Sequence, residues 1–343
     1  MFNKIKRLIK KSIIDYLSLF GILNYLHYKN RHKITVLMLH GVMEQNENVN
    51  WEPLRKQLPP SELARILGIL STNYQFITID QFIALVKGQI APIHNALLVT
   101  FDDGYRNTLD YALPICEQFN IKPILFVTTG HINSGLPFWF DRLDYALQQN
   151  MGESIEFNYL GVQYAFDTSS REALTESYKK FRDQCKNEFN NDVEMSQLFT
   201  ALAEMLESRA GKALSDICIE DDWSAIASWS EIENAVKQDR IDIGSHTVDH
   251  WRIDSLSENE ILEQLVNSKA EIEGNLSTKC QYFCYPNGDY NQMSIELLKQ
   301  AHYRAAFTTD VGLCKSKDDL MTLKRFNFPA NKTKSEILYL LNH

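Results

Sequence analysis

The sequence predicts an α/β fold in which about seven to eight parallel strands form a (β/α) barrel that carries a mainly helical insertion. Three observations predict it: short apolar runs alternate with amphipathic segments, about eight such runs are present, and polar residues follow several of them. A chain of 343 residues with 44% hydrophobic residues can bury a large core. We therefore expect residues 34–343 to form one barrel domain.

The expected strands are short, apolar and spaced widely enough to hold a helix between most of them. They are Thr35–Leu39, Gln75–Thr78, Leu97–Phe101, Ile124–Thr128, Ile241–Ser245, Tyr282–Tyr285, Ala305–Thr308 and Thr322–Phe326. The expected helices are Ser61–Leu70, Arg106–Phe119, Ser230–Lys237, Glu258–Gly274 and Ser294–Ala301. Ser257, followed three residues later by Glu260, is typical of a capping box at a helix start. Repeated strand–helix alternation predicts a parallel sheet, and about eight strands favour a closed barrel over an open sheet.

Residues 135–225 interrupt this alternation and contain two helix-like stretches, Ser170–Glu188 and Met195–Arg209. The insertion follows the run that ends at Thr128, so it should leave from the carboxyl-end face of the barrel, where active sites are built. We favour a cap over a substrate cleft, with an inert packed insertion as the alternative.

Composition limits the partners of the chain. Its formal net charge is −9 and the body of the chain has no basic face, which argues against nucleic acid and favours a small-molecule or glycan partner. The cysteines form no Cys-x-x-Cys pair, so reduced thiols are expected rather than a thiolate zinc cage or a dense disulfide framework. They are residues 116, 185, 218, 280, 284 and 314.

Residues 1–33 form a basic, amphipathic N-terminal segment with eight lysine and arginine residues against the single acidic Asp15. Its apolar stretch, residues 13–23, contains that charge, is too short to span a bilayer and lacks a clear signal-peptide cleavage site. Two alternatives stay open: a helix lying on an anionic membrane surface, or a helix packed on the barrel with a solvated basic rim.

Asp102 and Asp103 directly follow a buried apolar run, and Gly104 allows a sharp turn after them. Two adjacent carboxylates at the end of a buried strand predict a bound cation or a shared proton. The alternative is an ordinary Asp-Asp-Gly turn.

His246 and His250 also follow an apolar run, at a spacing that lets both imidazoles bind one metal ion. Together with one carboxylate they would make an open site with positions left for water and substrate. The turn Tyr285-Pro286-Asn287 could present backbone N–H groups to an anion, or be a plain turn. His40 and Arg325 lie at the end of, or late in, two further apolar runs. Polar groups at the same end of several strands are typical of a barrel active site.

The motifs Thr100–Tyr105, His246–His250 and Phe283–Gly288 resemble those of the polysaccharide deacetylase family, the NodB-homology domain of carbohydrate esterase family 4. The resemblance covers most of residues 34–330 apart from the insertion. It implies that Asp103, His246 and His250 bind one divalent metal ion, with zinc favoured, and that Asp102 is the general base. It further implies substrate or oxyanion contacts for four residues: Tyr105, Tyr285, Pro286 and Asn287.

Two departures from the family pattern bear on the mechanism. Cys284 and Asn287 replace the usual Arg and Tyr of the third motif, so the Arg that orients the base is missing there and Arg325 is the candidate substitute. The usual Leu-x-His motif near the C-terminus is absent, and Met38-Leu39-His40 resembles a permuted copy on the first strand. That resemblance would make His40 the general acid.

We therefore expect a metal-dependent hydrolase that removes an N-acetyl group from an amino sugar in a polysaccharide or a lipid-linked saccharide precursor. The basic segment 1–33 and the absence of a clear signal peptide favour a cytoplasmic bacterial enzyme in peripheral contact with the inner membrane. Two alternatives remain: a catalytically idle glycan-binding protein, or a metal hydrolase acting on another group such as a formamide or phosphoester.

Overall fold

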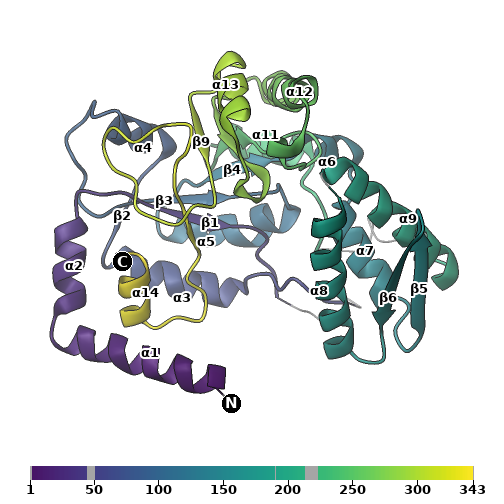
Figure 1. The fold of residues 1–343 in the computed structure, drawn as a ribbon. Coiled ribbons are helices and arrows are strands. Elements are labelled where there is room, and N and C mark those ends of the chain that lie inside the picture. Colours follow the sequence, from purple (N-terminus) through teal and green to yellow (C-terminus); the bar gives the residue numbers. More distant parts are fainter. Residues whose placement is uncertain (1, 45–50, 190, 213–222, 343) are drawn as a thin grey trace.

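The computed structural model describes residues 2–44, 51–189, 191–212 and 223–342. Its central sheet is wholly parallel and has the order β10-β1-β3-β4-β7-β8-β9, with β2 paired to β3. This confirms the predicted α/β class with a curled parallel sheet (Figure 1). The strands are β1 (Thr35–Leu39), β2 (Gln75–Phe76), β3 (Ala96–Phe101), β4 (Ile124–Val127), β7 (Asp242–Ser245), β8 (Tyr282–Cys284), β9 (Ala305–Phe307) and β10 (Phe326–Asn327).

The two edges of the sheet are joined by the chain that leads into β10. Leu323 bridges to Phe307 of β9 in parallel, and Phe326 then pairs with Leu37 of β1. The predicted strand Thr322–Phe326 is therefore wrong for all but its last residue. Residues 323–325 bond to the β9 side, and the chain must leave that edge before it reaches β1.

Helices cover the outside of the sheet, as expected for parallel strands buried on both faces. The helices are α3 (Pro60–Ser71), α4 (Ile79–Val86), the π-helical η1 (Thr108–Ala112), α5 (Leu113–Gln118), α6 (Thr129–Ser134), α11 (Trp229–Lys237), α12 (Glu258–Leu276), α13 (Gln292–Gln300) and α14 (Lys334–Leu340), with short 3-10 turns η2 (Ile253–Ser255) and η3 (Pro286–Gly288). The predicted capping box is confirmed, since Ser257 and Glu260 cap α12 reciprocally.

Two local predictions differ from the structure. The strand expected to reach Thr78 ends at Phe76, because Thr78 instead forms a capping box with Gln81 and starts α4, a helix that the sequence did not predict. The helix expected over Arg106–Phe119 splits into η1 and α5. Pro114 stands at this junction and has no N–H to donate to a carbonyl of the preceding turn.

The insertion forms a lobe beside the barrel with a core of its own (Figure 1). It contains α7 (Trp139–Gln148), α8 (Arg171–Glu188), α9 (Asp192–Ala210) and an antiparallel hairpin of β5 (Ser154–Tyr159) and β6 (Val162–Asp167). The hairpin was not predicted. Its turn residues Leu160 and Gly161 both have positive φ, which suits a tight hairpin turn, but Leu is an unusual residue there. Residues 213–222 of the insertion lie outside the described part.

The N-terminal segment forms α1 (Phe2–Leu19) and α2 (Ile22–Asn30), and α1 lies along α14 at the lower edge of the barrel in Figure 1. Ile14 and Leu23 are buried in the barrel core. The opposite face of α1 exposes Ile9, Ile13 and Tyr16 to solvent. None of the helices in the described ranges is both long and apolar enough to cross a bilayer. The described cysteines are unpaired and buried, and Cys218 lies outside the described residues.

Candidate metal centre and substrate cavity

The predicted metal ligands come from two strand ends that lie on one rim of the barrel. Asp103 follows β3, and His246 and His250 follow β7. Asp103 and His250 both adopt left-handed backbone conformations, with φ of 79° and 60°. Such conformations are costly for residues other than Gly and persist where surrounding structure holds them, often at functional sites.

These three side chains meet in a buried cluster, which we call the metal centre. Asp103 Oδ1 lies 3.6 Å from His246 Nε2 and 3.4 Å from His250 Nε2. This carboxylate oxygen is buried and has no hydrogen-bond partner among the described residues. A buried oxygen without a donor, facing two imidazole nitrogens, fits a divalent cation bound by two His and one Asp.

The orientation of His246 supports the same arrangement. Its Nδ1 lies 2.7 Å from the carbonyl oxygen of Cys284, so Nδ1–H donates to that carbonyl and leaves the Nε2 lone pair directed toward Asp103. Burial, and to a smaller extent the neighbouring His250, lower the pKa of His246 to about 4. The imidazole is therefore neutral near pH 7, as a metal ligand must be.

Asp102 lies beside the metal centre and is held by Arg325. The guanidinium donates from Nη1 to Oδ1 and from Nη2 to Oδ2, each at 2.8 Å. Burial alone would raise the pKa of Asp102, but the charge and hydrogen bonds of Arg325 bring it below its ordinary value. Arg325 is itself fixed by Thr100 Oγ1 at 3.0 Å and by the Thr308 carbonyl at 2.9 Å. The structure thus places Arg325 where the missing motif Arg would be needed.

Cys284 completes a second compact group with Asp102 and His246, all three of them buried. Both Asp102 oxygens already accept from Arg325, whose Nη2 also lies 3.0 Å from the Cys284 sulfur. Burial raises the pKa of the Cys284 thiol well above its ordinary value, so it stays protonated. This second group is a poor cation site, because the Cys284 thiol is protonated and both oxygens of Asp102 already accept hydrogen bonds from Arg325.

His40 follows β1, which pairs directly with β3 so that Leu39 is opposite Phe101. His40 and Asp102 therefore follow paired residues, and the Asp102 N–H donates to the Leu39 carbonyl at 2.9 Å. Burial lowers the pKa of His40, and the nearby Asp103 carboxylate opposes that shift. The His40 side chain borders a cavity that it shares with Arg55.

In the turn after β8, two of the side chains expected to contact substrate lie in the core. Tyr285 is fully buried, its hydroxyl donates to the Met321 carbonyl at 3.0 Å, and its N–H donates to Phe307. Pro286 is also buried. Substrate contact by these two side chains is therefore a correction to the sequence-based expectation, because both are packed in the core. Asn287, with φ of 55°, is the residue of this turn that lines a cavity between the barrel rim and the insertion, described below as the substrate cavity.

Tyr105 positions other groups and is buried away from the cavity. Its hydroxyl donates to Asp141 Oδ2 at 2.6 Å and accepts from Arg55 Nη2 at 3.1 Å. The same Arg55 nitrogen lies 3.4 Å from Asp103 Oδ2. The network Asp141–Tyr105–Arg55 thus connects the insertion to Asp103, a predicted metal ligand.

Arg55 and Asp141 were missed by the sequence analysis. Arg55 lies in a loop before α3 with no recognisable motif, and Asp141 lies in α7 of the insertion. The only available signal was indirect, because the insertion was expected to leave the barrel on the active-site face.

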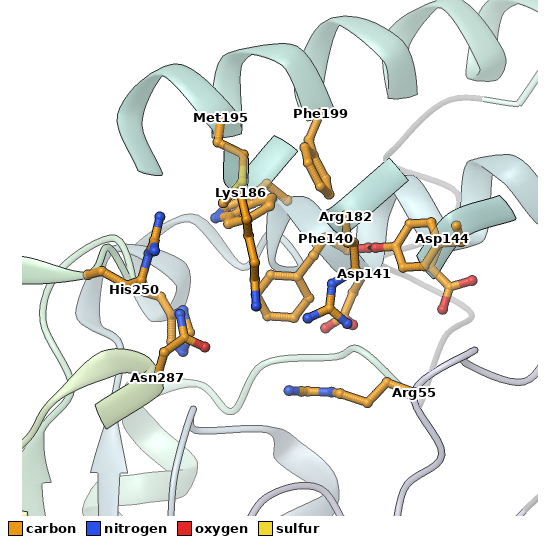
Figure 2. Close-up of a pocket in the computed structure, with 13 residues that line it drawn as sticks. Arg55, Phe140, Asp141, Asp144, Arg182, Lys186, Met195, Phe199, His250 and Asn287 are labelled. Carbon is orange, nitrogen blue, oxygen red and sulfur yellow. Dashed lines mark hydrogen bonds between the residues drawn. The ribbon is translucent and has the colours of Figure 1, made fainter. Parts of the chain in front are cut away.

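The substrate cavity lies between the insertion and the barrel rim (Figure 2). Its barrel side is lined by Arg55, His250, Arg252 and Asn287. Its insertion side combines aromatic and cationic groups with a Met and two acids: Trp139, Phe140, Asp141, Asp144, Tyr178, Arg182, Lys186, Met195 and Phe199. A cavity that opens onto His250, with an aromatic wall opposite, has the character of a ligand site.

Solved structures with the same fold include a named deacetylase. The Streptococcus pyogenes deacetylase PplD in complex with acetate superposes with a TM-score of 0.58 at 16% identity, over 90% of this chain and 98% of that one. IcaB from Ammonifex degensii gives 0.57 at 17% identity, over 91% and 97%. At these identities the likeness establishes the fold.

Sequence comparison identifies the family. The polysaccharide deacetylase family model matches residues 91–306, and the chain belongs to that family. The Bacillus subtilis (strain 168) protein YxkH, which carries a provisional polysaccharide deacetylase name, is 19% identical over 294 residues, 85% of this chain and 70% of YxkH.

Proposed function

We propose that this chain is a metal-dependent deacetylase that hydrolyses the N-acetyl group of an amino sugar in a polysaccharide or a lipid-linked saccharide precursor. One observation carries the proposal: the buried Asp103 Oδ1 has no partner among the described residues and faces the Nε2 atoms of His246 and His250. A protein that only binds glycans has no need of this arrangement beside an ionised Asp102.

The residues divide the reaction between them. Asp103, His246 and His250 would hold a divalent ion, with zinc favoured by the nitrogen-rich donor set, and when bound it would supply the Lewis acidity that activates water. Asp102, kept ionised by Arg325, accepts the proton of the attacking water. The N–H of Asn287 is the group we assign to the developing oxyanion, since Asn287 borders the cavity next to His250.

We assign the general acid to His40, the residue of the permuted Met38-Leu39-His40 sequence. Its support is the β1–β3 pairing, which places His40 and Asp102 side by side on the rim. In this proposal His40 gives a proton to the departing nitrogen while Asp102 takes one from water.

The test is product analysis with zinc-loaded protein. N-acetylated oligosaccharides, free and lipid-linked, are incubated with and without chelator, and acetate, formate and phosphate are measured together with the mass of the saccharide. We expect chelator-sensitive acetate release that D102N lowers about 10²- to 10⁴-fold while metal content stays unchanged. Formate or phosphate in place of acetate would establish another hydrolase, and no product from any arm would leave the glycan-binding alternative.

We further propose that α1 docks on the cytoplasmic face of an anionic bacterial inner membrane. Ile9, Ile13, Tyr16 and Phe20 repeat at helical spacing, and each is more than half exposed. The eight basic residues in the first 33 complement anionic headgroups, and such a helix lies in the interface rather than across it.

Vesicle co-sedimentation tests this surface. The protein is expected to bind vesicles that contain phosphatidylglycerol and not those of phosphatidylcholine alone. The double substitution I9D and I13D should weaken binding at least about tenfold. The matched control is L160D, because Leu160 is exposed at the tip of the β5–β6 hairpin, which lies in the insertion and away from α1. Equal binding by the double variant and the control contradicts the docking surface.

A further inference from the structure

The insertion presents a row of side chains toward the metal centre. Tyr178, Arg182 and Lys186 are spaced four residues apart on α8, so they lie on the same face of that helix. All three line the substrate cavity, opposite His250 and Asn287 of the barrel. Figure 2 shows the Arg182 and Lys186 side chains extending into the space above Arg55.

The positively charged side chains that line this cavity differ in whether they are already bonded to other residues. Arg252 donates to Asp192 from Nε at 2.9 Å and is paired with it through Nη2 at 2.8 Å. Arg55 is engaged by Tyr105 and Asp103. The side chains of Arg182 and Lys186, in contrast, have no hydrogen bond or ion pair with any other residue in the described ranges. These two charges are available to a ligand.

The two acids that line the cavity do not neutralise this pair by contact. Asp141 accepts from the Tyr105 hydroxyl at 2.6 Å. Asp144 accepts from the Leu54 N–H and from the Gln148 amide, each at 2.7 Å. Both carboxylates are buried, whereas Arg182 and Lys186 are exposed. A ligand entering the cavity therefore meets the cations.

An aromatic surface connects these cations to the metal centre. The Phe140 ring lies 5.8 Å, centroid to centroid, from the ring of His250, and the Arg55 guanidinium lies 5.3 Å from its centre. The hydroxyl of Tyr178 donates to the Phe140 carbonyl at 3.3 Å, so the row on α8 also fixes this aromatic position. A sugar ring stacked on Phe140 would have its N-acetyl side near the metal ligands and its other substituents near α8.

We propose that the insertion selects acidic saccharides, with Arg182 and Lys186 binding a carboxylate or phosphate group on the substrate whose N-acetyl group enters the metal centre. This inference rests on the proposed deacetylase function. Arg suits planar, two-point recognition of such oxyanions, and Lys adds a second positive charge one helical turn away.

The experiment measures binding separately from turnover. Calorimetry with zinc-loaded D102N protein uses three ligands: a neutral N-acetylglucosamine oligosaccharide, a hyaluronan oligosaccharide with carboxylates, and uridine diphosphate N-acetylglucosamine with phosphates. At least one anionic ligand should bind about tenfold more tightly than the neutral one, and the added substitutions R182A and K186A should remove that advantage without changing neutral binding. Which anionic ligand gains affinity identifies the group as carboxylate or phosphate.

A second test compares K186E with a matched control, K180E. Lys180 is exposed on α8 but lies about a third of a turn around the helix from Lys186, and it does not line the cavity. K186E should weaken binding of the anionic ligand more than tenfold, and K180E should leave it unchanged. Equal affinities for neutral and anionic ligands, or equal effects of K180E and K186E, overturn the proposal. Anionic binding through these residues without acetate release by the wild type would instead reject the deacetylase function, and acetate release without an anionic preference would reject the subsite alone.

Discussion

The barrel rim and the insertion face the same cavity, but the reactive side chains of the rim and the cations of the insertion are held in opposite ways. On the rim, Asp102 accepts two hydrogen bonds from Arg325, and His246 donates to a backbone carbonyl. Both side chains are buried. On the insertion, Arg182 and Lys186 are exposed and unbonded among the described residues.

This contrast separates two tasks. A hydrolytic centre needs groups fixed within a fraction of an ångström, which burial and outer hydrogen bonds provide. Recognition of a flexible saccharide tolerates long, mobile side chains that order only around the ligand. Substitutions on the rim should therefore lower kcat, and substitutions on the insertion should act mainly on substrate affinity.

The largest effect is expected at the metal centre. D103N removes the charged ligand while keeping the size of the side chain, so bound zinc should be weakened at least about 100-fold and acetate release should fall below detection. Zinc content by mass spectrometry checks this. D249N, which alters the carboxylate just before His250 that bonds to Gln264, should keep its zinc. A D103N protein with full zinc content would remove Asp103 from the ligand set.

A smaller effect on rate, and a shift with pH, is expected at Arg325. R325K keeps the charge but loses the two-point contact with Asp102, so kcat should fall about 10- to 100-fold. Burial favours the neutral carboxyl and Arg325 opposes it, so the pKa of Asp102 should rise in the variant. Because the base works only when ionised, the acidic limb of the pH–rate profile should move to higher pH. R304K, at an exposed guanidinium outside the site, should leave the limb in place.

The smallest effect on activity is expected at the junction between rim and insertion, where the expected change is in stability. Burial raises the pKa of Asp141 to about 7, although Arg55 and the Tyr105 hydroxyl oppose it. The folded state therefore binds a proton that the unfolded state has released, and this stabilisation is present below about pH 4 and lost as pH rises through about 7. D141N should be less sensitive to pH, and relative to wild type it should be more stable at pH 8 than at pH 5 by roughly 2–3 kcal/mol.

Thermal unfolding at the two pH values measures this difference, with exposed D183N on α8 as the control. Parallel loss of stability in wild type and D141N between pH 5 and pH 8 would show that Asp141 does not titrate in this range. The junction between rim and insertion would then depend on Arg55 and Tyr105, with no contribution from titration of the Asp141 carboxyl group.

Most of the barrel could be predicted from sequence because its strands are buried on both faces and read as short apolar runs. The carboxyl ends of parallel strands meet on one rim, so motifs that follow such runs could be assigned to one site. Strand β10 escaped prediction because it has only two residues and is set by the crossing from β9 to β1.

Arg55 could not be found in this way, because a loop residue has no periodicity and its role depends on the position of Tyr105 and Asp141. Tyr285 shows the opposite error. It belongs to a recognisable turn, yet the direction of its side chain is decided by core packing that no local pattern reveals.

The pairing of Asp102 with Arg325 also has a consequence for biosynthesis. The two residues are 223 positions apart, so at about 5–20 residues per second roughly 10–45 s of translation separate them. Until Arg325 arrives, the nascent polypeptide lacks the counter-ion that keeps its base ionised. In the proposed enzyme, a growing chain on the ribosome is therefore not expected to hydrolyse acetylated sugars before Arg325 has been added.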